Sequence, residues 1–174
     1  GRRARVENIK ATPEELAQKN ISVCQADRGG DVTYHGPGQI TVYPIFNLSY
    51  IKKDINLFLR SLEQVIIDLL AEFGLRGTRY SQATGVWVRG KKICSIGIGI
   101  RHWITFHGLS LNLASDDLFN FNLIRPCGMD IQMTSLETLL NQKIDSGRIK
   151  QLMVAKFRGI NNYINSQTTQ EVAV

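Results

Sequence analysis

The sequence predicts a single α/β domain of the mixed α+β type, with antiparallel strand pairs and interspersed helices. Residues 54–73 carry apolar side chains at a helical period, whereas residues 84–113 form β-branched segments separated by turns. The 174 residues, 43% of them hydrophobic, contain neither repeats nor a linker and can bury one substantial core. We therefore expect one domain over residues 1–165 and a loose tail over residues 166–174.

The chain opens with a short helix and a strand. Thr12, Pro13 and Glu15 form a capping box at the start of a helix over residues 12–19. The apolar run ISVCQA at residues 21–26 is expected to be a strand.

A glycine-rich loop and a second strand follow. Residues 28–39, RGGDVTYHGPGQ, hold four glycines and a proline, which exclude a long regular element. Residues 40–48, ITVYPIFNL, regain strand character, and Val42 and Ile45 are predicted to enter the core.

The middle of the chain holds a long helix and three strands. Residues 54–73 form the helix, and Gly74 ends it. Two strands flank the turn RGKK at residues 89–92, and residues 104–113 add a third.

The last third is predicted to be helical. Residues 134–142 begin with Thr134 and Glu137 as another capping box. A last helix spans residues 147–164. Its apolar stripe consists of Ile149, Leu152, Met153, Phe157 and Ile160.

Charge and composition narrow the class of protein. The net charge of +6 favours acidic partners, although a solvated basic face is the simpler interpretation of each cluster. Basic residues are not interleaved with aromatic residues as in RNA-binding strands, so nucleic acid is not expected as a partner.

Apolar runs of 18 residues are missing, which argues against a membrane span. Three cysteines without CxxC or HxxxH spacing argue against structural zinc and, lacking a secretory signal, for a reducing compartment.

Two glycine-rich segments are hard to explain by packing alone. In residues 28–39 the glycines let the backbone approach a ligand, with Arg28, Tyr34 and His35 as polar groups; a tight turn is the alternative. In residues 91–100 isoleucines alternate with glycines, so one strand face is nearly bare. Such a face suits a long apolar substrate, or else marks a bulge or close strand crossing.

Two reactive side chains stand in unusual surroundings. His107 lies within the apolar segment FHGLSLNL, where a structural role is the simpler interpretation. Cys127 lies between Pro126 and Gly128 on a sharp turn, next to backbone N–H groups that are candidates to bind an oxyanion. An inert loop cysteine is the alternative. Cys24 and Cys94 lie in expected strands and are weaker candidates.

Taken together, RGGDVTYHGPGQ, KKICSIG, FHGLSLN and PCGM, in this order, resemble the signature set of lipoyl(octanoyl) transferases. The resemblance runs from Gly1 to about residue 140. It implies a fold similar to that of biotin and lipoate protein ligases, with a mixed sheet flanked by helices.

The resemblance also implies an activity and its partners. Such enzymes move an octanoyl group from acyl carrier protein to a lysine of lipoyl domains. The acceptors are subunits of 2-oxoacid dehydrogenase complexes and the glycine cleavage H protein. The resemblance implies a cytoplasmic enzyme that needs neither a cofactor nor a metal.

The family's functional residues fall on positions of this chain. Its nucleophile falls on Cys127 through PCG, and its catalytic lysine falls on Lys92, not Lys91. The implied substrate-binding residues are Arg28, Gly29, Gly30, Asp31, Val32, Thr33, Tyr34, His35, Ser95, Ile96, Gly97, His107, Gly108, Leu109 and Ser110.

Elementary acid–base chemistry agrees with the two catalytic assignments. A free thiol with a pKa of about 8.5 is roughly 3% thiolate at pH 7. An ammonium group nearby that lowers the pKa by two units raises that fraction to roughly 75%. Lys92 is therefore expected to make Cys127 nucleophilic, so that an acyl thioester forms on Cys127 without ATP.

Some departures and rivals are open at this level. The family has a further N-terminal segment ahead of the position of Gly1, Ser110 stands where alanine is common, and one extra residue lies around Asp116–Asp117. An ATP-dependent lipoate ligase would not need Cys127. A basic binding module and a catalytically inactive adaptor are rivals of another class.

Overall fold

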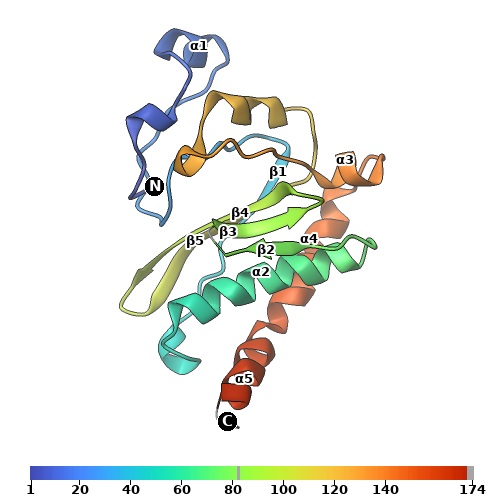
Figure 1. Ribbon diagram of the computed structural model, residues 1–174. Helices are drawn as coiled ribbons and strands as arrows, with labels where there is room; N and C mark the ends of the chain where they lie inside the picture. Colours follow the sequence, from blue (N-terminus) through green and yellow to red (C-terminus); the bar gives the residue numbers. More distant parts are fainter. Residues whose placement is uncertain (82, 172–174) are drawn as a thin grey trace.

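The computed structural model describes residues 1–81 and 83–171, with the side chains of Cys127 and residues 168–171 outside that description. One five-stranded sheet organises the fold, in the order β1-β5-β4-β3-β2, and neighbouring strands pair antiparallel (Figure 1). An isolated parallel bridge joins Lys92 to Met133. The strands are β1 Gln39–Val42, β2 Thr78–Tyr80, β3 Ala83–Val88, β4 Lys91–Arg101 and β5 Ile104–Asn112.

Two tight hairpins build the centre of the sheet, as the meander pattern predicts. Arg89 and Gly90 connect β3 to β4, and His102 and Trp103 connect β4 to β5. All four residues have positive φ, the backbone conformation that matches a two-residue turn to the twist of the strands.

The helices α2 (Ile55–Ala71), α4 (Ser146–Arg158) and α5 (Ile160–Glu171) pack together, and α2 lies along one face of the sheet (Figure 1). Asp54 caps the first turn of α2, and Gly74, with φ of +69°, follows its end, as expected. The apolar stripe of α2 supplies much of the core through Phe58, Leu62, Ile66, Leu69 and Leu70. Burying these side chains is the main stabilisation of this layer.

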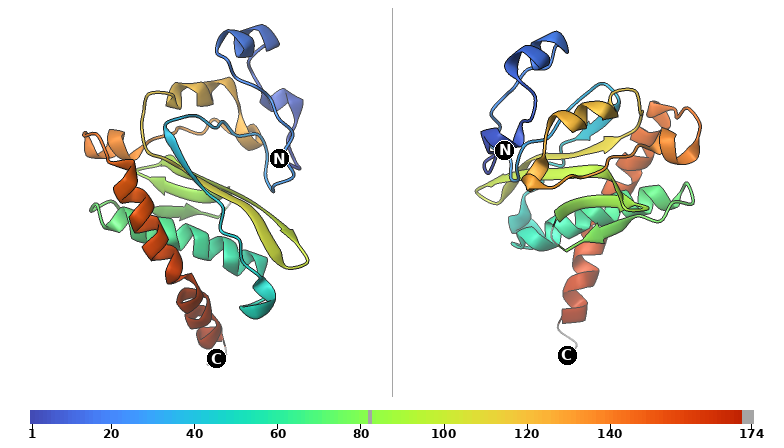
Figure 2. Two further views of the ribbon diagram at one scale, coloured as in Figure 1. Left: turned by 180° about the vertical axis from the view of Figure 1, so that it is seen from behind. Right: turned by 45° about the horizontal axis from the view of Figure 1, so that its top comes forward.

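Short elements complete the fold around the sheet. They are η2 (Leu48–Tyr50), η3 (Leu118–Leu123), η4 (Pro126–Gly128) and α3 (Leu136–Leu140). Figure 2 shows η3 and the segment leading to α3 on the side of the sheet opposite α2.

An N-terminal arm of residues 2–27 extends from this body and contains η1 (Val6–Asn8) and α1 (Pro13–Gln18). In every view α1 stands apart from the sheet (Figure 2). The predicted capping box is confirmed: Thr12 accepts from the N–H of Glu15, whose carboxylate accepts from the N–H of Thr12.

Two strand predictions in the first half are wrong. Residues 21–26 are an exposed extended segment of the arm, because their apolar side chains do not meet the core. The strand expected over residues 40–48 ends at Val42, since Pro44 lacks the N–H that a ladder needs. Ile45 is 60% exposed, whereas Val42 packs against the core as predicted.

The C-terminal helices also differ from the prediction. Ser135, not Thr134, caps α3, because its hydroxyl accepts from the N–H of Thr138. The single helix expected over residues 147–164 is divided at Gly159 into α4 and α5. Residues 166–171, expected to be loose, continue α5, and residues 172–174 lie outside the described part.

Within residues 1–81 and 83–171, every helix is too short or too polar to cross a bilayer. The same residues bring no three metal-ligating side chains together in a potential metal site.

Candidate active site

One large cavity is enclosed by strands and the loops that cross them. Its volume is about 820 Å³, within the range of cavities that hold small ligands. Its lining includes the loop of residues 28–35, the strands β4 and β5, the segment 126–133 and the start of α2.

The cavity brings the predicted substrate-binding residues together. Residues 28–35, 95–97 and 107–110 all line it, and so does Lys92. We call the lining residues of β4 and β5 the strand wall, and residues 28–35 the loop wall. Segments that are distant in sequence thus share one site.

The bare glycine face of β4 lets neighbouring groups approach the strand closely. A side chain at Gly97 would meet the carbonyl oxygen of Gly29 at 2.9 Å and the Arg28 side chain at 3.1 Å. A side chain at Gly99 would collide with the ring of Phe106. Gly97 therefore lines the cavity where the loop wall approaches the strand closely, and its use as a substrate floor stays a prediction.

A few hydrogen bonds attach the loop wall to the rest of the protein. The N–H of Gly29 donates to the carbonyl of Ile98 at 2.7 Å. The side-chain amide of Asn8 donates to the carboxylate of Asp31, and both residues are buried. The guanidinium of Arg28 is partly buried, and this desolvation lowers its pKa.

The second half of the glycine-rich loop is tied to η3. The Tyr34 hydroxyl donates to Asp117 at 3.2 Å and accepts from the Asn120 amide at 3.0 Å. Desolvation by burial raises the pKa of Tyr34. The His35 ring pairs with Gln39 at 3.1 Å and is exposed at the end of the loop.

His107 combines a backbone strain with a specific partner. Its φ of +56° is unusual for a residue with a side chain, and such strain is frequent at functional sites. Its ring forms a hydrogen bond with the carboxylate of Asp27 and packs edge-on against Tyr43. The hydrogen bond from His107 lowers the pKa of Asp27 below its usual value. His107 thus connects the strand wall to the arm.

A β-bulge in β4 decides which lysine faces the cavity. Val86 pairs with Cys94, whereas the next residue, Trp87, pairs with Lys92, so Ile93 is one extra residue in β4. Residues directly opposite in a ladder share a face, and consecutive residues of β3 alternate. Lys92 consequently lies on the face opposite Cys94, which packs in the core.

The surroundings of Lys92 fix its position. Its backbone N–H donates to Gln132, and its carbonyl accepts from Thr134. Its ammonium nitrogen lies 4.9 Å from the centre of the Trp87 ring, a cation–π contact, and the residue is 9% exposed. Lys91, by contrast, is exposed. Lys92 is thus the lysine of this pair that lines the cavity.

The backbone of Cys127 lies in η4, and its side chain lies outside the described part of the structure. Pro126 and Met129, on either side of it, line the cavity. The expectation that adjacent N–H groups bind an oxyanion finds no support at Gly128 and Met129, which donate to Arg125 and Pro126 within the turn.

The other two cysteines differ sharply from each other. Cys94 is fully buried, and desolvation raises the pKa of its thiol to about 12, which makes it unsuitable as a nucleophile. Cys24 is exposed and lines the same cavity, contrary to its expected place in a strand.

Sequence reasoning missed Glu63, a fully buried carboxylate on α2. Its Oε1 accepts from the N–H of Gly85 in β3. The only signal in the sequence is a charge on the apolar stripe of a helix, next to Leu62 and three residues before Ile66.

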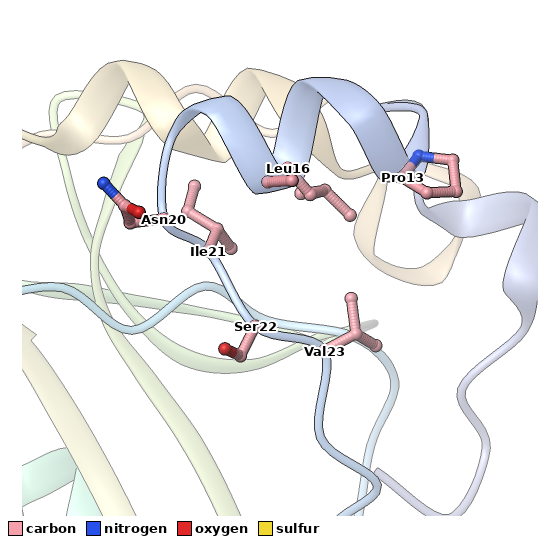
Figure 3. A pocket seen from close by; sticks show the side chains of 7 residues that line it. Pro13, Leu16, Asn20, Ile21, Ser22 and Val23 are labelled. Atoms are coloured by element: carbon pink, nitrogen blue, oxygen red, sulfur yellow. The ribbon is translucent and has the colours of Figure 1, made fainter.

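A second pocket of about 590 Å³ lies between α1 and the chain that follows it (Figure 3). Side chains such as Leu16, Ile21 and Val23 line it together with the polar Asn20 and Ser22. All seven lining residues are non-ionisable, so acid–base chemistry is assigned to the larger cavity.

Comparisons with known proteins agree with this geometry. The family described as the lipoyl protein ligase A/B catalytic domain matches residues 1–158. The octanoyltransferase of Thermoanaerobacter pseudethanolicus is 43% identical over 171 residues, covering 97% of this chain and 73% of that protein. The octanoyltransferase of Caldicellulosiruptor saccharolyticus is 48% identical over 162 residues, covering 91% of this chain and 68% of that protein.

Solved structures share the fold at low sequence identity. A lipoate-protein ligase A bound with ATP has a TM-score of 0.70 at 12% identity, covering 90% of this chain and 65% of its own. The biotin protein ligase of Aquifex aeolicus has a TM-score of 0.60 at 12% identity, covering 77% of this chain and 57% of its own. The predicted fold class is confirmed. The chain, with its four motifs gathered at one cavity and relatives more than 40% identical, belongs to the octanoyltransferase family.

Proposed function

We propose that this protein transfers an octanoyl group from acyl carrier protein to a lysine of a lipoyl domain, through a thioester on Cys127. The observation that carries the proposal is the shared lining of one cavity. Lys92, Pro126 and Met129 near Cys127, and all fifteen predicted substrate-binding residues contribute to it.

The cavity supplies the two environments that such a reaction needs. Side chains such as Ile96, Leu109 and Met133 offer apolar contact to a hydrocarbon chain. Lys92 supplies a cation at the same cavity, where low exposure strengthens its effect on a neighbouring charge.

In the first half-reaction the thiolate of Cys127 attacks the carbonyl carbon of the carrier thioester. The bond between the carbonyl carbon and the carrier sulfur then breaks, and the leaving thiolate takes a proton from the ammonium of Lys92. The products are an octanoyl thioester on Cys127, a free carrier thiol and a neutral Lys92.

In the second half-reaction the neutral amine of the acceptor lysine attacks the thioester. Lys92 accepts the proton that the attacking nitrogen loses, and the thiolate of Cys127 leaves. An amide forms, and the initial pair of thiolate and ammonium is regenerated, so the cycle requires no ATP.

Charge and redox chemistry extend the proposal to partners and location. The net charge of +6 complements acidic partners, and we infer lipoyl domains of 2-oxoacid dehydrogenase complexes and of the glycine cleavage H protein as acceptors. We place the reaction in the cytoplasm, where a reactive thiol stays reduced.

Intact-protein mass spectrometry after incubation with octanoyl-acyl carrier protein tests the nucleophile. We expect one octanoyl adduct on the unmodified protein, its absence in Cys127→Ala, and its discharge when a lipoyl domain is added. Cys24→Ala is the matched control, since it removes the other thiol of the cavity and should keep the adduct. An adduct that persists in Cys127→Ala refutes the assignment.

A further inference from the structure

Glu63 is a charged side chain without solvent contact, for which the proposed reaction has no direct use. Its carboxylate is fully buried, and burying a charge is unfavourable unless partners compensate for the lost hydration. Two arginines do so: Oε2 lies 2.7 Å from Arg60 and 3.2 Å from the Nε of Arg79.

The other carboxylate oxygen is directed to the backbone of β3. Oε1 accepts from the N–H of Gly85 at 3.0 Å. β2 pairs with β3 at Trp87 and at Ala83, and the register shifts between these pairs, around Gly85. Glu63 thus holds an N–H at an irregular position of the sheet, where a buried donor must find a partner.

Because Gly85 has no side chain, the side chain of Lys92 can lie directly over it. Its φ is +141°, and a side chain there would meet Cε of Lys92 at 2.6 Å and Nζ at 3.2 Å. Gly85 also lies two residues before Trp87, whose ring faces the Lys92 ammonium, and so shares its face of the strand. The segment that Glu63 anchors is therefore the segment against which Lys92 packs.

A second observation places Glu63 and Lys92 in the same neighbourhood. Both charges act on the buried thiol of Cys94, Lys92 lowering its pKa and Glu63 raising it. Cys94 follows the bulge at Ile93 that directs Lys92 to the cavity face.

We infer that Glu63 is a positioning residue for Lys92. By accepting from the N–H of Gly85 it fixes the distorted stretch of β3 over which the Lys92 side chain reaches the cavity. The inference rests on the proposed role of Lys92 in activating Cys127.

A double-mutant cycle on thiol reactivity separates positioning from general structural support. The rate of alkylation of Cys127 by iodoacetamide at neutral pH, in a Cys24→Ala background, reports how well Lys92 activates the thiol. We expect Glu63→Leu to slow alkylation about fivefold or more when Lys92 is present, and less than about 1.5-fold in Lys92→Met. Equal slowing in both backgrounds overturns the inference.

Conservative and alternative variants complete the design. Glu63→Gln keeps an oxygen acceptor for Gly85 and should retain at least about half of the alkylation rate; a rate as low as that of Glu63→Leu overturns the hydrogen-bond explanation. Asp68→Asn, an exposed carboxylate on the same helix, is the matched control and should leave the rate unchanged. If Glu63→Leu does not fold, Glu63→Asp takes its place in the cycle with the same expected dependence on Lys92, because the shorter side chain withdraws the carboxylate from the N–H of Gly85.

Failure of this inference is distinguishable from failure of the proposed function. If Lys92→Met alkylates as fast as the unmodified protein, the activating role of Lys92 fails. If Lys92→Met is slow while the effect of Glu63 is independent of Lys92, the positioning role alone fails.

Discussion

The two walls of the cavity are built by different means. The strand wall belongs to a sheet whose central pair, β4 and β5, is in register over eight residue pairs from Cys94–Leu111 to Arg101–Ile104, and it packs on α2. The loop wall depends on single contacts such as those of Gly29 and Asp31. Local stability follows buried contacts and paired backbone groups, so we expect the loop wall to open long before the strand wall does.

The largest effect is expected in the core of the sheet that carries the strand wall. Leu111 is fully buried and pairs with both Ile40 and Cys94. Leu111→Ala should lower the free energy of unfolding by about 2–5 kcal/mol, because it leaves a cavity in a packed core. Urea denaturation measures this change. Val23→Ala, at an exposed position of the arm, is the control and should change stability by less than about 0.5 kcal/mol.

A smaller effect, confined to the local stability of the loop wall, is expected when the hydrogen bond between Asn8 and Asp31 is removed. Asn8→Ala removes the amide that donates to buried Asp31. Amide exchange over residues 28–35 should accelerate about tenfold or more, whereas exchange in β4 stays unchanged. Equal acceleration in both regions would show that the walls open as one unit. Asn161→Ala, at an exposed position of α5, serves as the control.

The smallest effect concerns the link between the strand wall and the arm. The pKa of Asp27 is lower in the folded protein than in the unfolded chain. The contact between Asp27 and His107 therefore contributes fully to the stability of the folded state above the ordinary aspartate pKa of about 3.9. The contribution is lost as the pH falls through the lowered value. In His107→Ala, which removes the donor, we expect the pKa of Asp27 measured by carbon NMR titration to lie in its ordinary range. An unchanged titration curve would contradict the link.

The spacing of apolar residues and of turn residues in the sequence predicted the parts of the fold that depend on local sequence alone. The stripe of α2 and the hairpin at Gly90 follow local rules, and the structure confirms them. The run at residues 21–26 satisfied the same rule and yet forms no strand, because pairing depends on which neighbour is available in space.

The site was predictable where motifs carry it and not where tertiary contacts do. Residues 28–35 and Lys92 line the cavity as the resemblance implied, although sequence alone would place Lys92 on the same face as Cys94. Glu63 was not predicted as a site residue because its role depends on a hydrogen bond from the N–H of Gly85, which is distant in the sequence. The role of Cys127 as nucleophile stays a prediction.

The extra residue at Ile93 decides which of two adjacent lysines lies on the cavity face of β4. Lys91 and Lys92 carry the same functional group. They differ in how they pair with β3, and this pairing sets the face on which each one lies. If β4 paired with β3 without an extra residue, Ile93 would lie opposite Trp87, and Lys92 would turn to the face of Cys94. The place of Lys92 at the cavity therefore depends on the presence of an extra residue in β4 more than on which hydrophobic side chain that residue carries.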